Sequence, residues 1–180
     1  MKPASSIVRA TCPNTKPTRL RAACDKRLLP LLLLLALPAV AQAQFTCTTN
    51  NGAITITGYT GPGGAVTIPD TTNGLPVTSI GNYAFFDCTS LTSVMIGANV
   101  TSIGGAAFES CTGLTNVTIG ANVTSVGGAA FYYCTALASV NIPNSVTSIG
   151  GAAFESCTGL TNVTIGANVT SIGEIGRAHV

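Results

Sequence analysis

The chain has 180 residues and a formal net charge of +2, but its charges are strongly segregated. Seven of the eight Lys and Arg residues lie within the first 27 positions, whereas residues 44–173 contain no Lys, Arg, His or Trp and only four acidic residues. The body of the chain therefore lacks the cations that a nucleic-acid or anionic-membrane surface requires, and we expect no nucleic-acid partner.

Residues 1–43 have the organisation of an export signal. A basic stretch is followed by an apolar run from Leu28 to Val40, and then by the tripeptide Ala41-Gln42-Ala43. The apolar run, about 13 residues long, is too short to cross a bilayer as a helix. These features predict a Sec-type secretory signal cleaved before Gln44, with a buried Leu-rich helix as the alternative. The mature protein is then expected to be secreted or held at the cell surface, without a transmembrane helix.

Residues 44–65 are predicted to form a β-hairpin. Alternating segments at Phe45–Thr49 and Ala53–Thr57 flank Asn50-Asn51-Gly52, and Asn-Gly between such segments is a strong hairpin signal. We expect this hairpin to cap the open edge of the repeats that follow, because a stack of repeats exposes unpaired backbone groups at its ends.

Residues 66–173 are built on a 23-residue repeat. Val66–Pro69 and Val77–Ser79, joined by a longer connection, form a degenerate first coil. Four gapless repeats and the start of a fifth follow, at Ile80–Ser102, Ile103–Ser125, Val126–Ser148, Ile149–Ser171 and from Ile172; residues 103–125 and 149–171 are identical. One such unit cannot bury its own apolar side, so the period predicts coils stacked into a solenoid that is mainly β.

Within one repeat the pattern predicts the path of the chain. Residues 114–119 alternate as a strand does, with Val117 and Ile119 inward and Asn116 and Thr118 outward. Gly120-Ala121-Asn122 is a turn, residues 123–126 form a second short extended piece, and Gly127-Gly128 turns the chain again. From Ala129 we expect a short helical or 3-10 turn that directs Phe131 into the core.

Residues 174–180, Glu-Ile-Gly-Arg-Ala-His-Val, break the repeat pattern. The heptapeptide resembles the translation of a common sequencing adapter, which implies that it is an artefact and that the natural chain continues differently. An ordinary C-terminal tail is the alternative.

The repeat resembles the BspA-type leucine-rich repeats of bacterial surface and secreted proteins. The family pattern is met by Ile103-Gly104, Ala107-Phe108, Cys111, Leu114, Val117-x-Ile119 and Val123-Thr124-Ser125, and the resemblance covers residues 66–173. The proline that usually follows the strand persists at Pro69 and Pro143 and is glycine in the other repeats. The resemblance implies a right-handed leucine-rich-repeat coil stack with a parallel strand sheet on one face, and roles in adhesion or extracellular recognition.

A column of cysteines also follows the repeat, at Cys88, Cys111, Cys134 and Cys157. Stacked coils would place neighbours about 4.8 Å apart, within the Cα range of a disulfide, and export would permit oxidation. The inward position nevertheless favours buried thiols over vertical disulfides. We expect no metal site, because a column lacks tetrahedral convergence and no histidine is available.

Few side chains could support catalysis. Glu109 and Glu155 occupy the same repeat position two coils apart, roughly 9–10 Å, near the upper limit for an inverting glycoside hydrolase. Because both sit in identical repeats, nothing sets their pKa values apart as such a pair requires. We therefore expect no enzyme activity, no catalytic residues and no cofactor, and a carboxylate-based hydrolase is the distant alternative.

The outward positions of the strands are the remaining candidate site. They are predicted to form one ladder of mostly uncharged polar side chains: Ser93, Met95, Asn116, Thr118, Ser139, Asn141, Asn162 and Thr164. Such a face could bind an extracellular protein or polysaccharide, although every exposed strand needs polar outward residues. A structural spacer that presents a further domain is the alternative function. A second ladder, Thr101, Thr124, Thr147 and Thr170, is equally regular, and flat threonine arrays also suit ice binding.

Overall fold

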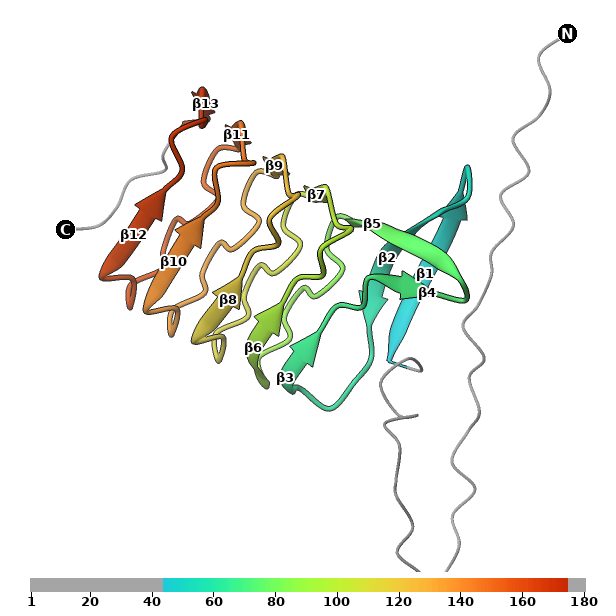
Figure 1. Ribbon diagram of the computed structural model, residues 1–180. Coiled ribbons are helices and arrows are strands. Elements are labelled where there is room, and N and C mark those ends of the chain that lie inside the picture. Colours follow the sequence, from blue (N-terminus) through green and yellow to red (C-terminus); the bar gives the residue numbers. More distant parts are fainter. Residues whose placement is uncertain (1–43, 175–180) are drawn as a thin grey trace, which may run out of the picture.

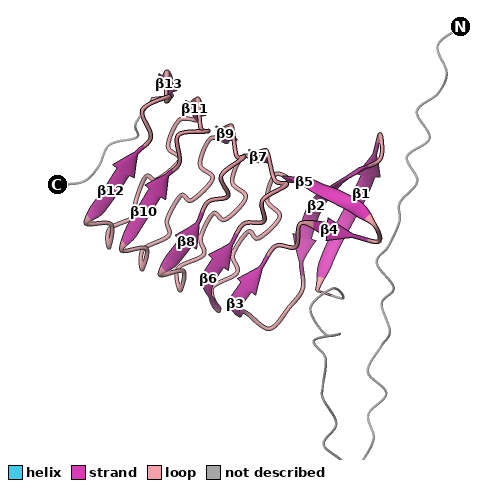
Figure 2. Ribbon diagram, viewed as in Figure 1, coloured by secondary structure: helices cyan, strands magenta, loops and turns pink. Residues whose placement is uncertain are grey.

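The computed structural model describes residues 44–174 and shows a stack of coils with two sheets (Figures 1 and 2). Sheet A has the strand order β1-β2-β5-β7-β9-β11-β13, with the short β4 paired to β5, and sheet B has the order β12-β10-β8-β6-β3. The strands of sheet A are β1 (Phe45–Asn50), β2 (Ala53–Tyr59), β4 (Thr71–Thr72), β5 (Leu75–Ile80), β7 (Ser102–Ile103), β9 (Ser125–Val126), β11 (Ser148–Ile149) and β13 (Ser171–Ile172). Those of sheet B are β3 (Gly64–Thr67), β6 (Leu91–Met95), β8 (Asn116–Thr118), β10 (Ser139–Ile142) and β12 (Asn162–Ile165).

Every strand of sheet B is parallel to its neighbour, and from β6 to β12 neighbouring strands are offset by one repeat. Val94 lies opposite Val117, Val117 opposite Val140, and Val140 opposite Val163. Since the register shift between the regular coils equals the repeat length, like residues form columns. The predicted mainly β solenoid of stacked 23-residue coils is confirmed.

The core is a set of such columns, and a single file of phenylalanine rings runs through it. The ring centroids of Phe85 and Phe108 are 4.8 Å apart, those of Phe108 and Phe131 5.1 Å, and those of Phe131 and Phe154 5.2 Å. The last two ring pairs are within 5° of parallel. This file confirms that successive repeats lie directly on one another.

The segment that leads from sheet A to sheet B differs from the prediction. The helical or 3-10 turn expected there from Ala129 to Phe131 does not form. Within the described residues the chain forms no helix at all. Ala129 and Tyr133 have φ angles of +55° and +59°, in the left-handed region, and a right-handed helix cannot include such residues. The reason lies in the stack: the N–H groups of Ala129, Phe131 and Tyr133 donate to carbonyls of the next coil instead of to their own turn.

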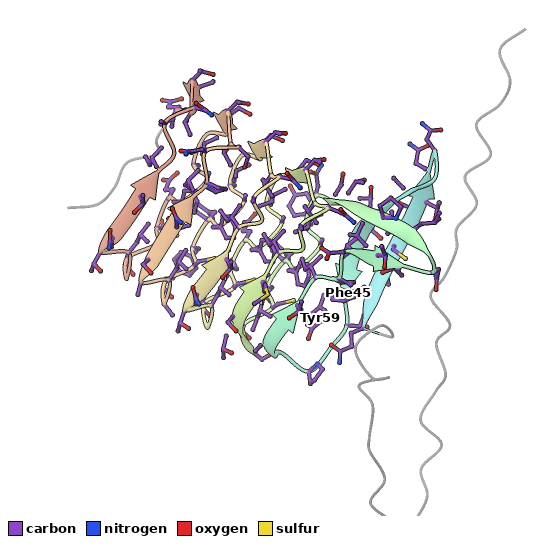
Figure 3. All side chains as sticks on the ribbon, in the orientation of Figure 1. Phe45 and Tyr59 are labelled. Carbon is purple, nitrogen blue, oxygen red and sulfur yellow. The ribbon has the colours of Figure 1, made fainter. Side chains whose placement is uncertain are left out.

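An antiparallel ribbon of β1 and β2 occupies the N-terminal end of the stack. β2 also pairs in parallel with β5, so the ribbon extends sheet A beyond the first coil. Phe45 and Tyr59 of the ribbon (labelled in Figure 3) pack against Phe85, with ring centroids 6.2 and 5.2 Å away. The phenylalanine file thus meets aromatic rings at its start. The longer connection in the first coil contains β4, which forms a second small ribbon with the start of β5.

Side chains join neighbouring coils at the tight turn that follows sheet B. The side-chain amide of Asn122 donates to the Ala98 carbonyl of the preceding coil at 2.7 Å, and Asn168 donates to the Asn144 carbonyl at 2.8 Å. Asn99 makes the corresponding bond to Asp70 at 3.0 Å. Ser145 holds this position in the third regular coil, and its buried hydroxyl has no hydrogen-bond partner.

Candidate binding face

The outer face of sheet B carries the eight residues predicted as a ladder, and we call it the binding face. The strand register divides them into two columns of four, which begin at Ser93 and at Met95, respectively. The first column is Ser93, Asn116, Ser139 and Asn162, and the second is Met95, Thr118, Asn141 and Thr164. All are exposed except the half-buried Ser93, while Val94, Val117 and Val140 between the columns point into the core.

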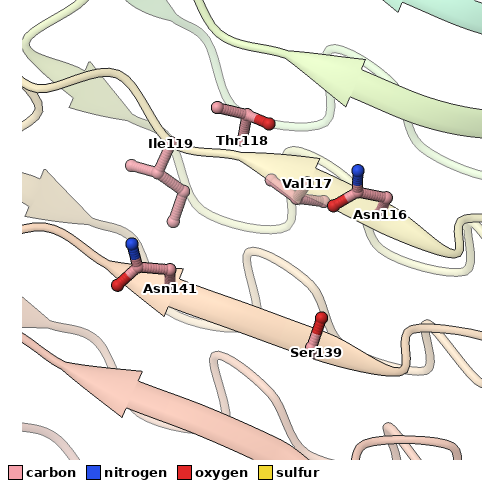
Figure 4. A pocket seen from close by; sticks show the side chains of 6 residues that line it. All are labelled: Asn116, Val117, Thr118, Ile119, Ser139 and Asn141. Atoms are coloured by element: carbon pink, nitrogen blue, oxygen red, sulfur yellow. The ribbon is translucent and has the colours of Figure 1, made fainter.

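A shallow groove lies between β8 and β10 at the middle of this face (Figure 4). Its volume is about 220 Å³, and its lining consists of Asn116, Val117, Thr118, Ile119, Ser139 and Asn141. Four of the eight predicted residues therefore meet in one depression, whereas Ser93, Met95, Asn162 and Thr164 lie on the strands to either side of it.

The polar groups of the binding face are not used by the fold. No side chain of the eight makes a hydrogen bond within residues 44–174. None of the eight side chains is ionisable, so ligand recognition there depends on neutral hydroxyl and amide groups and on the Met95 side chain, which is 54% exposed. The face can therefore offer donors and acceptors to a ligand without breaking any bond of the protein.

The second predicted ladder has a different role. The hydroxyls of Thr101, Thr124, Thr147 and Thr170 donate to the carbonyl of the threonine one coil earlier, at distances from 3.0 to 3.2 Å. These hydroxyl protons are used to join the coils. This ladder is thus part of the scaffold and does not offer the free donors that the binding face does.

The cysteine column is made of thiols that join coils. The Sγ atoms of Cys111, Cys134 and Cys157 donate to the carbonyls of Phe85, Phe108 and Phe131 at 3.1 to 3.2 Å, and none of the four cysteines of the column forms a disulfide. Burial raises the pKa of Cys111 to about 12, with a further contribution from Cys88. Burial also raises the pKa of Cys88, and Asp87 adds to this shift. Such thiols are poor nucleophiles, because the thiolate is the reactive form.

The carboxylates are dispersed over the described residues. Glu109 and Glu155 lie in the segment between the sheets, on a different side of the coils from the groove, and the Asp70 carboxylate accepts a hydrogen bond from the Ala98 N–H at a turn. Residues 44–174 contain no cluster of His, Cys, Asp and Glu that could hold a metal ion. No described helix is long and apolar enough to span a membrane.

Sequence reasoning overlooked three exposed aromatic residues outside the binding face. Tyr83, Phe86 and Tyr133 are 62%, 50% and 48% exposed, in the segment between the sheets. The signal that could have found them is their departure from the repeat, since the consensus coil of residues 103–125 has Ala, Glu and Ser at these positions. The predicted secretory signal at 1–43 and the tail from residue 175 onward lie outside the described residues.

The chain is similar to known bacterial repeat proteins. Residues 65–175 match the model of the BspA type leucine rich repeat region, in six copies. A leucine rich cell surface protein from Faecalibacterium prausnitzii is 34% identical (TM-score 0.56); the match covers 73% of this chain but only 43% of that protein. A leucine-rich repeat protein from Bacteroides capillosus is 30% identical, with coverage of 68% and 94% and a TM-score of 0.62.

A more distant solved structure has the same architecture. The T. pallidum leucine rich repeat protein is 25% identical, with a TM-score of 0.52 and coverage of 76% of this chain and 85% of that one. A search of curated proteins found no match.

Proposed function

Because this chain belongs to the BspA-type leucine-rich repeat family, we propose that it is a non-catalytic protein of the bacterial surface or its surroundings that binds an extracellular partner. The partner is a protein or a polysaccharide, and the binding face of sheet B holds it. The chain spans less than half of the Faecalibacterium prausnitzii protein to which it is similar, so the proposal concerns the repeat region.

The observation that carries this proposal is the free hydrogen-bonding capacity of the binding face. Two columns of neutral side chains run across four strands with a fixed spacing, and a groove of about 220 Å³ separates Asn116 from Asn141. A rigid sheet holds these groups in place, so a ligand does not have to order them on binding. Unlike the Thr101 ladder, these groups have no structural use.

Two further observations support export and display. The similar protein from Faecalibacterium prausnitzii is described as a cell surface protein. In addition, the sequence of residues 1–43 predicts a secretory signal. Cleavage before Gln44, read by mass spectrometry of the secreted or surface-exposed protein, tests this part independently of binding.

Arrays of glycans and extracellular proteins, probed with the full chain, test the binding proposal. The decisive variant is Ser139→Arg, which places a bulky cation in the groove at an exposed position and leaves the core unchanged. Thr158→Arg is the matched control, because it adds the same side chain at an exposed position outside sheet B. We expect Ser139→Arg to abolish at least one array signal that Thr158→Arg preserves.

Other outcomes would favour the alternative functions. Silence of the unmodified chain on both arrays would contradict binding and favour a structural spacer. Hydrolysis of a polysaccharide that is lost in Glu109→Gln or Glu155→Gln would contradict the non-catalytic assignment.

A further inference from the structure

The segments that connect sheet A to sheet B form a side of the solenoid that we call the turn face: residues 81–90, 104–113, 127–136 and 150–159. Four aromatic residues of this face, Tyr83, Phe86, Tyr132 and Tyr133, form what we call the aromatic strip. Tyr83, Phe86 and Tyr133 are exposed and Tyr132 is half-buried. They belong to the first and third regular coils only.

The aromatic strip is not needed to form the turns. The coil of residues 103–125 has Ala106, Glu109 and Ser110 at these positions and makes the same connections, since the Ala106 N–H donates to Gly128 as the Tyr83 N–H donates to Gly105. Tyr83 and Tyr133 also have φ angles of +58° and +59°, a conformation that is unfavourable for bulky side chains. The fold does not require the rings of Tyr83 and Tyr133, and yet they are exposed at positions with a strained backbone. Both features point to a role in binding.

Carboxylates are interleaved with the rings along the strip. Phe86, Glu109, Tyr132 and Glu155 occupy one position in four successive coils. Backbone hydrogen bonds from Asp87 to Glu109 and from Tyr133 to Glu155 keep these coils in contact. Because core rings in adjacent coils are 4.8 to 5.2 Å apart, the aromatic pairs of the first and third coils are separated by about 10 Å.

We propose that the aromatic strip, Tyr83, Phe86, Tyr132 and Tyr133 with Glu109 between them, is a second binding site, for an extended neutral polysaccharide. The C–H faces of sugar rings stack on the electron-rich faces of aromatic rings, and sugar hydroxyls donate to the interleaved carboxylates. The two aromatic pairs, two coils apart, would contact every second sugar of an extended chain. This site is separate from the binding face of sheet B.

The charges and the ring arrangement favour this ligand class over others. Residues 44–174 contain acidic residues and no Lys, Arg or His, so a polyanion would be repelled. Recognition of a quaternary ammonium group needs several rings around one cation, each within about 6 Å. Here Tyr83 pairs with Phe86 at 6.0 Å and Tyr132 with Tyr133 at 6.2 Å, and the two pairs follow one another along the coil axis.

The protein provides its own optical probe for the test. The full chain has no Trp and four Tyr, of which three lie on the strip and Tyr59 packs in the core. We would titrate it with hexasaccharides of β-1,4-glucose, β-1,4-xylose, β-1,4-mannose and β-1,3-glucose, following tyrosine fluorescence and calorimetric heat. We expect at least one of them to bind and to change the fluorescence. Binding of none of them overturns the proposal.

A consensus variant separates the strip from the fold. Tyr83→Ala, Phe86→Glu, Tyr132→Glu and Tyr133→Ser introduce the residues that residues 103–125 already carry in the same turn. A second version with Phe86→Gln and Tyr132→Gln leaves the charge unchanged. We expect both versions to weaken binding by about tenfold or more, because ring contacts are lost. Unchanged affinity in both overturns the proposal.

Matched controls identify the site. Ala121→Arg adds a bulky side chain at an exposed turn position outside both the strip and the binding face, so this variant should bind the hexasaccharide like the unmodified chain. Loss of hexasaccharide binding in Ser139→Arg would instead assign it to the binding face. Tighter binding of choline, spermidine or an oligolysine, or a solution dimer that dissociates in both consensus variants, would overturn the polysaccharide assignment.

Discussion

Two coils with the same sequence have different environments in this molecule. Residues 103–125 lie inside the stack, and residues 149–171 form the last full coil that the structure describes. Val117 is 4% exposed and its counterpart Val163 is 46% exposed, while Ile119 is 8% and Ile165 50% exposed. Since the two sequences are identical, the whole difference comes from the presence of a following coil.

Burial of a side chain in this fold therefore depends on the neighbouring coil. A single coil presents its Val and Ile side chains at an open end, and only the next coil covers them. Stability therefore grows with each interface between coils, as expected of repeat proteins. The following experiments compare equivalent positions in the two coils, and then in a coil that departs from the consensus.

Amide hydrogen exchange should show the largest difference. We expect amides of residues 115–119 to exchange only through extensive unfolding, and the equivalent amides of residues 161–165 through local opening, several orders of magnitude faster. Mass spectrometry of the full chain, with fragments that distinguish the two copies by their flanking residues, measures this. Equal protection of both coils would mean that sequence, not position, determines local stability.

Truncation of the two equivalent phenylalanines should show the second largest difference between the coils. Phe108 is fully buried between two rings of the file, whereas Phe154 is half-buried. We expect Phe108→Ala to lower the free energy of unfolding by about 3–5 kcal/mol. Phe154→Ala should cost about 1–2 kcal/mol, because less apolar area is lost from the core. Urea unfolding followed by circular dichroism compares them, and equal costs would contradict the neighbour argument.

The repeat period explains why so much of this fold could be predicted from sequence. Phe85, Phe108, Phe131 and Phe154 form a file because a constant period places like residues in columns. The inward and outward positions of β8 followed from the alternation of Asn116, Val117 and Thr118. In both cases one local pattern, repeated, fixed the contacts between coils.

The turn segment shows where this reasoning fails. Ala129 and Ala130 favour helix locally, but hydrogen bonds to the next coil impose a left-handed φ at Ala129. The aromatic strip was overlooked for another reason. A search for shared positions gives the scaffold, whereas Tyr83, Phe86 and Tyr133 are departures from it. In a regular repeat protein, the positions that depart from the repeat consensus are those at which a binding function can be sought.

Alkaline pH should distinguish the equivalent cysteines Cys111 and Cys157. Burial raises the pKa of folded Cys111 to about 12, while an unfolded thiol ionises near 9.0. Between these values the unfolded state binds fewer protons than the folded state, so the free energy of unfolding falls as pH rises. For this group the difference is at most one bound proton, which limits the slope of the free energy against pH. Cys111→Ala should therefore make the loss of stability between pH 9 and pH 12 less steep.

The control is Cys157→Ala. Interaction with the neighbouring Cys134 thiol lowers the pKa of Cys157, against the opposing effect of burial, so Cys157 ionises more readily than Cys111 in the folded state. Its removal should leave the alkaline loss of stability at least as steep as in the unmodified chain. Urea unfolding at several pH values compares the slopes. If the two variants gave the same slope, burial of Cys111 would not be the cause.

Ser145→Asn should have the smallest effect, and it should stabilise. In the other regular coils an Asn side chain at this position donates to a carbonyl of the preceding turn, whereas the buried Ser145 hydroxyl has no partner. An Asn side chain there would reach the Ala121 carbonyl as Asn122 reaches Ala98, and we expect a gain of about 1 kcal/mol in the free energy of unfolding. Asn122→Ser is the reciprocal control and should lose a similar amount. Both variants exchange the same two residue types in adjacent coils. A loss of stability in Ser145→Asn would therefore mean that the Pro143-Asn144 turn of the third coil holds its backbone differently from the consensus turn.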